Sequence, residues 1–199
     1  MEVFYLKKEE FLNSINIKSL EEFSDGRAYS SEVKYEQHLC GLFLTKFIAK
    51  NVYGLKNTDI VLRGAKPVFA SNKMNFSISH SNNIVLVAFN NFNIGADVEF
   101  MRRRDYKDIL QRYTDTPEDP TREEFYRFWT LHEAQIKLDN EPRALFSAIL
   151  EKDYMFTCVS DNVLVTNSHV KKLMLSGDGI DLVSEHKSPK QIQLKVLVA

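Results

Sequence analysis

The sequence has only two cysteines, Cys40 and Cys158, and they lie far apart in the chain. Two distant cysteines provide neither a disulfide framework nor the ligands of a structural zinc site. We therefore expect both thiols to be reduced and buried in the core.

The chain also has little net charge and no long apolar run. Its formal charge is -1, so no broad electrostatic attraction to nucleic acid or to a membrane surface is expected. No apolar stretch reaches the ~18 residues that a membrane-spanning helix requires. Residues 1–14 alternate apolar and charged side chains, which is unlike a signal peptide. These absences favour a cytoplasmic protein that binds neither nucleic acid nor membrane.

Length and composition predict one globular unit. Hydrophobic residues make up 44% and charged residues 27% of the 199 residues, which are ordinary proportions for a soluble protein. A chain of this length forms one large domain or two small halves that share a core. We therefore treat residues 1–199 as a single unit.

Hydrophobic periodicity predicts several strands and one helix before residue 100. Residues 32–50 should form a helix, because Leu39, Phe43 and Phe47 fall on one stripe. Within residues 1–20 we expect a short strand followed by polar turns. Further short strands are expected at 61–63, 74–78, 84–89 and 93–100. Polar turns join the last three of these strands, which favours an antiparallel meander.

The pattern after residue 100 begins with helices and ends with strands. Residues 102–113 should be helical, Pro117 and Pro120 interrupt the chain, and a Thr121–Glu124 capping box opens a helix at about 122–138. Strand-like runs follow at 154–159, 163–165, 172–175 and 191–198. Helices and strands in blocks, without strict alternation, predict the α+β class.

Two carboxylates lie on the strand predicted at 93–100. Asp97 and Glu99 in I-G-A-D-V-E are two residues apart, so their side chains leave the same face of the strand. Like charges this close repel each other unless a cation lies nearby. Magnesium, which takes one or two carboxylates and completes its shell with water and phosphate oxygens, would satisfy them. The alternative is a solvent-facing acidic strand.

The helix at 122–138 carries W-T-L-H-E-A-Q-I-K at residues 129–137. Glu133 and Lys137 are four residues apart and share one helix face, with His132 next to Glu133. An ordinary salt bridge on an amphipathic helix would explain the pair equally well.

Basic side chains occur near the predicted turns. His80 lies in S-I-S-H-S at residues 77–81, and Lys66 lies in G-A-K-P at residues 64–67. Each could contact phosphate oxygens, and each could equally be a solvated surface residue. Two carboxylates on a strand, a third on a later helix, and nearby Lys and His side chains together describe a metal-assisted phosphate-transfer site.

The order S-H-S, then I-G-A-D-V-E, then W-T-L-H-E-A-Q-I-K resembles the 4'-phosphopantetheinyl transferases of the surfactin-synthetase type. That family shows S-H-S, then G-I-D-I-E or close variants, then W-(S/T)-x-K-E-(A/S)-x-x-K. The clear resemblance covers about residues 64–138 and extends weakly to 32–50. It implies two similar α+β halves, about 1–100 and 101–199, related by a pseudo-twofold axis. It also implies that coenzyme A binds in the cleft between the halves, and that the chain is a monomer.

The resemblance implies the reaction and its partners. The phosphopantetheine arm of coenzyme A would pass to a serine of an apo acyl or peptidyl carrier protein, with Mg²⁺ or Mn²⁺, releasing adenosine 3',5'-bisphosphate. The carrier would belong to fatty-acid, polyketide or nonribosomal-peptide synthesis. Asp97, Glu99 and Glu133 would hold the metal, Glu133 would also deprotonate the serine, and the phosphate and nucleotide contacts would come from Lys137, His80, Lys66, Ser79 and His132.

Some residues depart from the family pattern. His132 stands where the family has a lysine, and G-A-K-P has one residue more than the family's G-K-P. The run Arg102–Arg104 could dock an acidic carrier protein or could be a solvated turn. Two other functions stay open: a non-catalytic binder of coenzyme A or another nucleotide, and a metal-dependent hydrolase of a phosphate ester.

Overall fold

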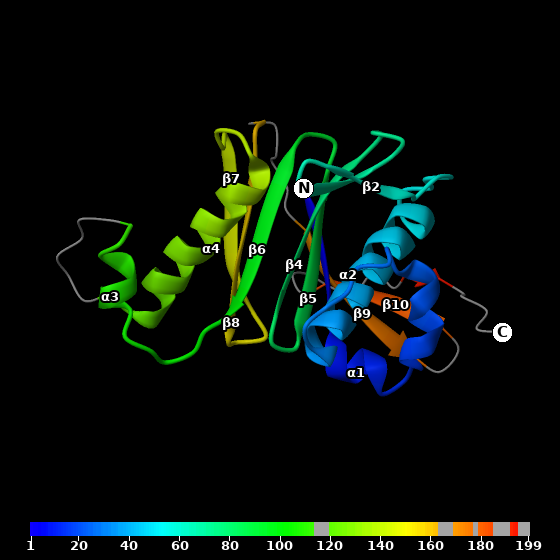
Figure 1. Ribbon diagram of the computed structural model, residues 1–199, viewed down its shortest axis with the longest axis horizontal. Helices are drawn as coiled ribbons and strands as arrows, with labels where there is room; N and C mark the ends of the chain where they lie inside the picture. Colours follow the sequence, from blue (N-terminus) through cyan, green and yellow to red (C-terminus); the bar gives the residue numbers. More distant parts are fainter. Residues whose placement is uncertain (114–119, 163–168, 177–178, 185–191, 195–199) are drawn as a thin grey trace.

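The structure is a computed structural model that describes residues 1–113, 120–162, 169–176, 179–184 and 192–194 (Figure 1). Its elements, in chain order, are β1 (Glu2–Lys7), α1 (Lys8–Leu12), the 3₁₀ helix η1 (Ile17–Phe23), α2 (Glu32–Asn51), β2 (Ile60–Arg63), β3 (Lys66–Phe69), β4 (Asn75–Ser81), β5 (Ile84–Asn90), β6 (Ile94–Phe100), α3 (Lys107–Leu110), α4 (Arg122–Leu138), β7 (Ala144–Leu150), β8 (Tyr154–Ser160), β9 (His169–Ser176), β10 (Gly179–Ser184) and β11 (Ile192–Leu194).

These strands form three sheets. The six-stranded sheet has the order β11-β10-β9-β1-β5-β4, the three-stranded sheet has the order β6-β8-β7, and β2 and β3 form a separate hairpin. β1 pairs antiparallel with β5 and parallel with β9, so it joins the two ends of the chain. Helices and mostly antiparallel sheets confirm the α+β class.

The molecule is layered, with a long helix outside each of the two larger sheets (Figure 1). α2 packs on one face of the six-stranded sheet, where Leu44 and Ile48 meet Val85 and Val87. The opposite face of this sheet packs against the three-stranded sheet. α4 covers the outer face of the three-stranded sheet, and no described helix is long and apolar enough to cross a membrane.

β1 shows why the central strands are apolar on both faces. Phe4 and Leu6 face the core under α2, whereas Val3 and Tyr5 face the core between the sheets, and all four are fully buried. β5 is divided in the same way, which explains the continuous apolar run predicted as a doubly buried strand.

α4 begins and ends as its sequence predicts. The hydroxyl of Thr121 accepts from the Glu124 amide, and the Glu124 carboxylate accepts from the Thr121 amide. This capping box satisfies helix amides that would otherwise lack partners. The helix ends at Leu138, because Asp139 takes a left-handed conformation with φ of 55°.

The predicted meander is wrong. β4 and β5 form an antiparallel pair, but β6 pairs with β8 in the other sheet. The edges of β5 are already occupied by β1 and β4, so the chain after β5 must continue elsewhere. β6 therefore comes from the first predicted half, 1–100, while β9, β10 and β11, from 101–199, extend the six-stranded sheet.

Other differences are local. The helix predicted over 102–113 is limited to α3 (Lys107–Leu110), and the polar turns predicted before residue 20 contain α1 and the start of η1. The sequence analysis also did not predict β3 as a strand. The run at 163–165 lies outside the described residues, and of 191–198 only 192–194 is described. Both cysteines are free and buried, as predicted, and burial raises the pKa of Cys40 to about 12.

Candidate active site

The two carboxylates of β6 leave the strand on the side that faces α4. Ile94, Ala96 and Val98 point into the core between the sheets, so the alternating residues Asp97 and Glu99 face the helix. Asp97 is only 5% exposed and Glu99 is half-buried. The solvent-facing acidic strand considered above is therefore excluded for Asp97.

Lys137 of α4 reaches the same place. Its ammonium donates to Asp97 Oδ1 at 2.7 Å, to Ser79 Oγ at 3.1 Å and to the Ala96 carbonyl oxygen at 3.1 Å. An ammonium has three N–H donors, so all three are directed at protein oxygens. The ion pair of Lys137 is thus with Asp97, and it joins two motifs that are far apart in the sequence.

Gly95 permits this close approach of helix and strand. A Cβ at residue 95 would overlap the carbonyl oxygen of Ala134 and lie 2.6 Å from the Leu138 amide nitrogen. Just beyond the other end of β6, the Arg102 amide donates to the Tyr126 hydroxyl near the start of α4 at 2.9 Å. The helix and the strand therefore run in opposite directions. Glu133, one turn before Lys137, therefore lies in the direction of Glu99.

The donor chemistry of Asp97 and Glu99 fits a divalent cation. Asp97 Oδ2 is buried, and no hydrogen-bond partner for it is found among the described residues. Burial, together with the nearby charge of Asp97, raises the pKa of Glu99, although the bond from Ser81 opposes this. A bound Mg²⁺ would give Asp97 Oδ2 a partner and would stabilise the charged form of Glu99, because magnesium prefers carboxylate oxygens.

Glu133 does not complete a three-ligand cluster in this structure. Within the described parts of the chain, no three His, Cys, Asp or Glu side chains lie close enough to hold a metal ion. A two-carboxylate arrangement still suits magnesium, because substrate phosphates and water commonly supply its remaining ligands.

His80 lies on the opposite face of β4 from Ser79. It is the exposed member of the strand, next to residues such as Ile78 that pack under α2. Surrounding protein atoms still desolvate the ring, and this effect, followed by the positive charge of Lys137, lowers the pKa of His80. The structure thus brings His80 into the electrostatic neighbourhood of the Lys137–Asp97 pair.

Two other predicted residues make different contacts. Lys66 donates to Asn93 Oδ1 at 2.5 Å and to the Ile94 carbonyl oxygen at 3.1 Å, which ties the β2–β3 hairpin to the start of β6. His132 lies in an aromatic cluster, with ring centroids 5.0 Å from Tyr113 and 6.0 Å from Trp129. Among the residues that the structure describes, neither Lys66 nor His132 bonds Asp97 or Glu99.

A known protein matches this chain across these motifs and beyond them. The 4'-phosphopantetheinyl transferase ffp of Bacillus subtilis is 26% identical over 168 residues, with 74% of this chain and 73% of the relative covered. The chain is therefore similar to a 4'-phosphopantetheinyl transferase over about three quarters of its length. No protein-family model matches it. The similarity agrees with the motif resemblance and supports a transferase enzyme of this family.

The serines of S-I-S-H-S have contacts that the sequence did not lead us to expect. Ser79 donates to Asp97 Oδ1 at 2.8 Å, and Ser81 donates to Glu99 Oε2 at 2.7 Å. Ser79 was predicted near the nucleotide, and Ser81 was not predicted at all. The alternation of serine at 77, 79 and 81 was the available signal, because residues two apart on a strand share a face.

The arginines that follow β6, Arg102 to Arg104, are exposed. Arg104 donates to the Tyr126 hydroxyl at 3.1 Å and stacks 5.3 Å from the Phe125 ring centre. Arg102 and Arg103 are exposed as well. Their exposure leaves the docking role predicted for this run open.

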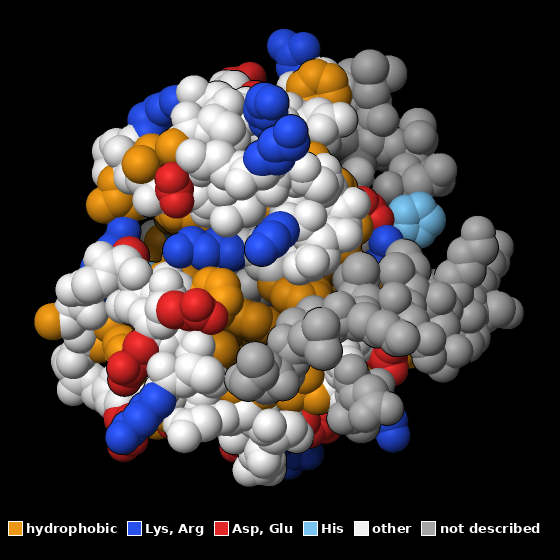
Figure 2. Space-filling view, turned by 90° about the vertical axis from the view of Figure 1, so that its right-hand side faces the viewer, with side chains coloured by type: hydrophobic (Ala, Val, Ile, Leu, Met, Phe, Trp, Pro, Cys, Tyr) orange, Lys and Arg blue, Asp and Glu red, His pale blue; other side chains and the backbone are white. Residues whose placement is uncertain are grey.

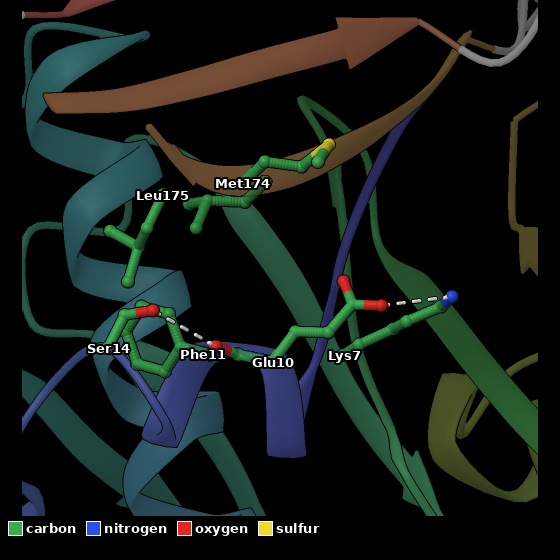
Figure 3. A pocket seen from close by; sticks show the side chains of 7 residues that line it. Lys7, Glu10, Phe11, Ser14, Met174 and Leu175 are labelled. Atoms are coloured by element: carbon green, nitrogen blue, oxygen red, sulfur yellow. Dashed lines mark hydrogen bonds and ion pairs between the residues drawn. The ribbon is translucent and has the colours of Figure 1, made fainter. Parts of the chain in front are cut away.

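A small pocket lies away from these motifs, between α1 and β9 (Figure 3). Its volume is about 60 Å³, and it is lined by Lys7, Glu10, Phe11, Ser14, Leu173, Met174 and Leu175. Lys7 and Glu10 form an ion pair at 3.2 Å across its edge. Figure 2, which views the α2 side of the molecule, shows basic and acidic side chains on one face, without a surface of a single sign.

Proposed function

We propose that this chain transfers 4'-phosphopantetheine from coenzyme A to a serine of an apo acyl or peptidyl carrier protein. The carrier serine Oγ forms a bond to the pantetheine-side phosphorus, and the bridging P–O bond of the pyrophosphate breaks. Adenosine 3',5'-bisphosphate leaves with the electron pair of that bond. The serine belongs to the substrate, so the chain needs no nucleophile of its own.

The observation that carries the proposal is the joining of the motifs at Asp97. Strand β6 supplies Asp97, strand β4 supplies Ser79, and helix α4 supplies Lys137, all within hydrogen-bond distance. The similarity to a 4'-phosphopantetheinyl transferase supports assigning this reaction to the cluster.

We assign Mg²⁺, or Mn²⁺ as a substitute, to Asp97 and Glu99, and to Glu133 as a third ligand that would join them only when the metal and coenzyme A bind. A bound Mg²⁺ would neutralise negative charge on the pyrophosphate of coenzyme A. Support comes from Asp97 Oδ2, which is buried and has no hydrogen-bond partner within the described ranges, and from the half-buried Glu99. Glu133, directly or through water, takes the proton of the carrier serine.

The phosphate oxygens of coenzyme A are assigned to Lys137 and His80, and the nucleotide to Lys66, Ser79 and His132. Lys137 must exchange at least one of its three protein acceptors for a phosphate oxygen when coenzyme A binds. His80 lies on the opposite face of β4 from Ser79, and the positive charge of Lys137 is one of the causes that lower its pKa.

The proposal extends to the whole chain. Two similar halves with a pseudo-twofold relation would enclose coenzyme A, and one long helix outside each large sheet supports this arrangement. Strands from both ends of the chain share the six-stranded sheet, which supports a single folding unit. We propose that this unit works as a monomer in the cytoplasm. Arg102 and Arg103 would attract an acidic carrier protein.

Intact-protein mass spectrometry tests the function. Apo carrier proteins of the fatty-acid, polyketide and nonribosomal-peptide classes are incubated with the chain, coenzyme A and Mg²⁺. We expect at least one carrier to gain the mass of one phosphopantetheine group, and EDTA to abolish the gain. Coenzyme A binding without any gain would favour the non-catalytic binder. Breakdown of coenzyme A without carrier modification would favour the hydrolase.

A further inference from the structure

The two large sheets meet along a seam between β4 and β6. Within the described chain, β4 forms a backbone ladder with β5, and β6 forms one with β8, but β4 and β6 form none with each other. Yet they lie side by side (Figure 1). The backbone groups on the facing edge of β6 therefore need partners other than a neighbouring strand.

Three serine hydroxyls of β4 provide those partners. Ser77 Oγ accepts from the Ala96 amide at 2.9 Å, Ser79 Oγ from the Val98 amide at 3.2 Å, and Ser81 Oγ from the Phe100 amide at 3.0 Å. Every second side chain of β4 faces the same way, and every second amide of β6 points to the same edge. The serines and the amides therefore repeat with the same period of two residues. The seam is thus closed by side chains in place of a backbone ladder.

Only two of the three hydroxyls make a second bond that reaches a carboxylate. Ser79 donates to Asp97 at 2.8 Å and Ser81 donates to Glu99 at 2.7 Å. In the part of the chain that the structure describes, Ser77 Oγ bonds only the Ala96 amide. Because a hydroxyl has one donor and two acceptor lone pairs, the seam bond and the carboxylate bond fix its direction together.

We propose that Ser79 and Ser81 are positioning residues, which orient the metal-binding carboxylates of Asp97 and Glu99 by anchoring them to the seam between the two sheets. The inference rests on the metal site of the proposed function. Partners that hold a ligand's second oxygen set its orientation, and removing such a partner typically lowers metal affinity about 10–100-fold. The geometry of the metal site then depends on how the two sheets are aligned.

Ser77 provides a matched control. Ser77→Ala removes a seam bond of the same kind, to the Ala96 amide of β6, but it removes no bond to a carboxylate. A purely structural role predicts similar effects for Ser77→Ala and Ser81→Ala. A positioning role predicts that only Ser81→Ala and Ser79→Ala weaken the metal. Ser81→Thr and Ser81→Val form a second pair, since they have nearly the same shape and differ by one hydroxyl.

The test is a titration of the full chain with Mn²⁺, followed by electron paramagnetic resonance with coenzyme A present, without a carrier protein. We expect the Kd for Mn²⁺ to rise about tenfold or more in Ser81→Ala and Ser79→Ala. Ser77→Ala should leave the Kd unchanged, and Ser81→Thr should bind more tightly than Ser81→Val. Melting curves establish that each variant is folded. If Ser81→Ala does not fold, the comparison of Ser81→Thr with Ser81→Val tests the positioning role.

Equal Kd values for Ser77→Ala and Ser81→Ala, or for Ser81→Thr and Ser81→Val, would overturn the inference, as would a wild-type chain that does not bind Mn²⁺. The transfer reaction is measured separately. A chain that shows the expected Mn²⁺ pattern but modifies no carrier would lose the proposed function and keep the positioning role of the serines.

Discussion

Lys137 Nζ lies 2.7 Å from Asp97 Oδ1, although the two residues are 40 positions apart in the chain. The side chain of Asp97 is only 8% exposed and that of Lys137 is 31% exposed, so the carboxylate is the more deeply buried partner. The pair connects the helix that covers the three-stranded sheet with the strand at its edge.

Lys137→Met should lower the free energy of unfolding by about 2 kcal/mol. The substitution leaves a buried carboxylate without its cation, and a hydrogen bond to a charged group is typically worth about 1.5–3 kcal/mol. Urea denaturation measures the loss. Lys56→Met, at an exposed loop position, is the control and should change stability little. Equal effects of the two substitutions would contradict a structural contribution of the pair.

Asp97→Asn and Glu133→Gln should both reduce transfer at subsaturating Mg²⁺, but for different reasons. The loss in Asp97→Asn should shrink as Mg²⁺ is raised, because a weakened metal site refills. Glu133→Gln should stay slow, by about 10²-fold or more, since general-base catalysis contributes at least that much. Initial rates over a Mg²⁺ series distinguish the two. Glu123→Gln, on the exposed side of α4, is the control, and undiminished transfer by Asp97→Asn would refute the metal assignment.

Gly95→Ala should destabilise the protein more than a glycine substitution in an open loop. A Cβ at residue 95 meets the backbone of α4, so the helix must move away from β6 and carry Lys137 with it. Gly64→Ala is the control, because Gly64 has a φ of 63° but no atom within 4 Å of the new Cβ. Its cost should be only the conformational one, about 1 kcal/mol. Thermal melting compares them, and a smaller loss in Gly95→Ala would contradict the close packing of strand and helix.

His80 should titrate at a lower pH in the folded protein than the ordinary value of about 6.5. Burial and the Lys137 charge both lower its pKa, while Asp97 opposes them and His38 adds to them. The folded state then resists protonation, so the contribution of neutral His80 to stability is present above about pH 6.5 and is lost as the pH falls.

Nuclear magnetic resonance of the imidazole signals checks this directly. In Lys137→Met the pKa of His80 should rise, since one of the two main causes of its depression is removed. Asp97 in that variant loses its cation partner and would favour protonated His80 further. An unchanged or lower pKa in Lys137→Met would show that His80 does not respond to Lys137.

His132→Lys should tighten binding of coenzyme A and reduce its dependence on pH between 6 and 8. A lysine remains charged throughout this range, and the family resemblance has a lysine at this position. The cost is the loss of ring contacts with Tyr113 and Trp129. His132→Gln, which removes the ring without adding charge, is the control. Calorimetric titrations should give equal affinities for wild type and His132→Lys only if residue 132 does not contact the ligand.

Local patterns accounted for the elements that bear the site. The period of two in residues 93–100 predicted that Asp97 and Glu99 share a face, and the structure turns that face toward α4. The capping box at Thr121 predicted the start of α4, and the structure confirms it. These features depend on backbone geometry over a few residues, which is why single segments were sufficient to predict them.

Pairing between distant segments was harder to predict. Turn residues between β5 and β6 suggested that these two strands pair. Instead, β6 pairs with β8, and α3, α4 and β7 lie between them in the chain. The i,i+4 spacing of Glu133 and Lys137 suggested an internal salt bridge, yet Lys137 binds Asp97. Neither outcome follows from local spacing, because each depends on which edge or face remains free once the sheets have formed.

The sequence by itself determined the chemistry available to this protein: two carboxylates on one strand face, a lysine and a glutamate on one helix face, and alternating serines on a third element. Only the tertiary structure decided which of these groups meet. The layers that bury the apolar faces bring β4, β6 and α4 together, and Gly95 lets the helix approach closely enough for contact. Burial of those faces arises from long-range packing, and it therefore decided that Lys137 and Ser79 bond Asp97 and that Ser81 bonds Glu99.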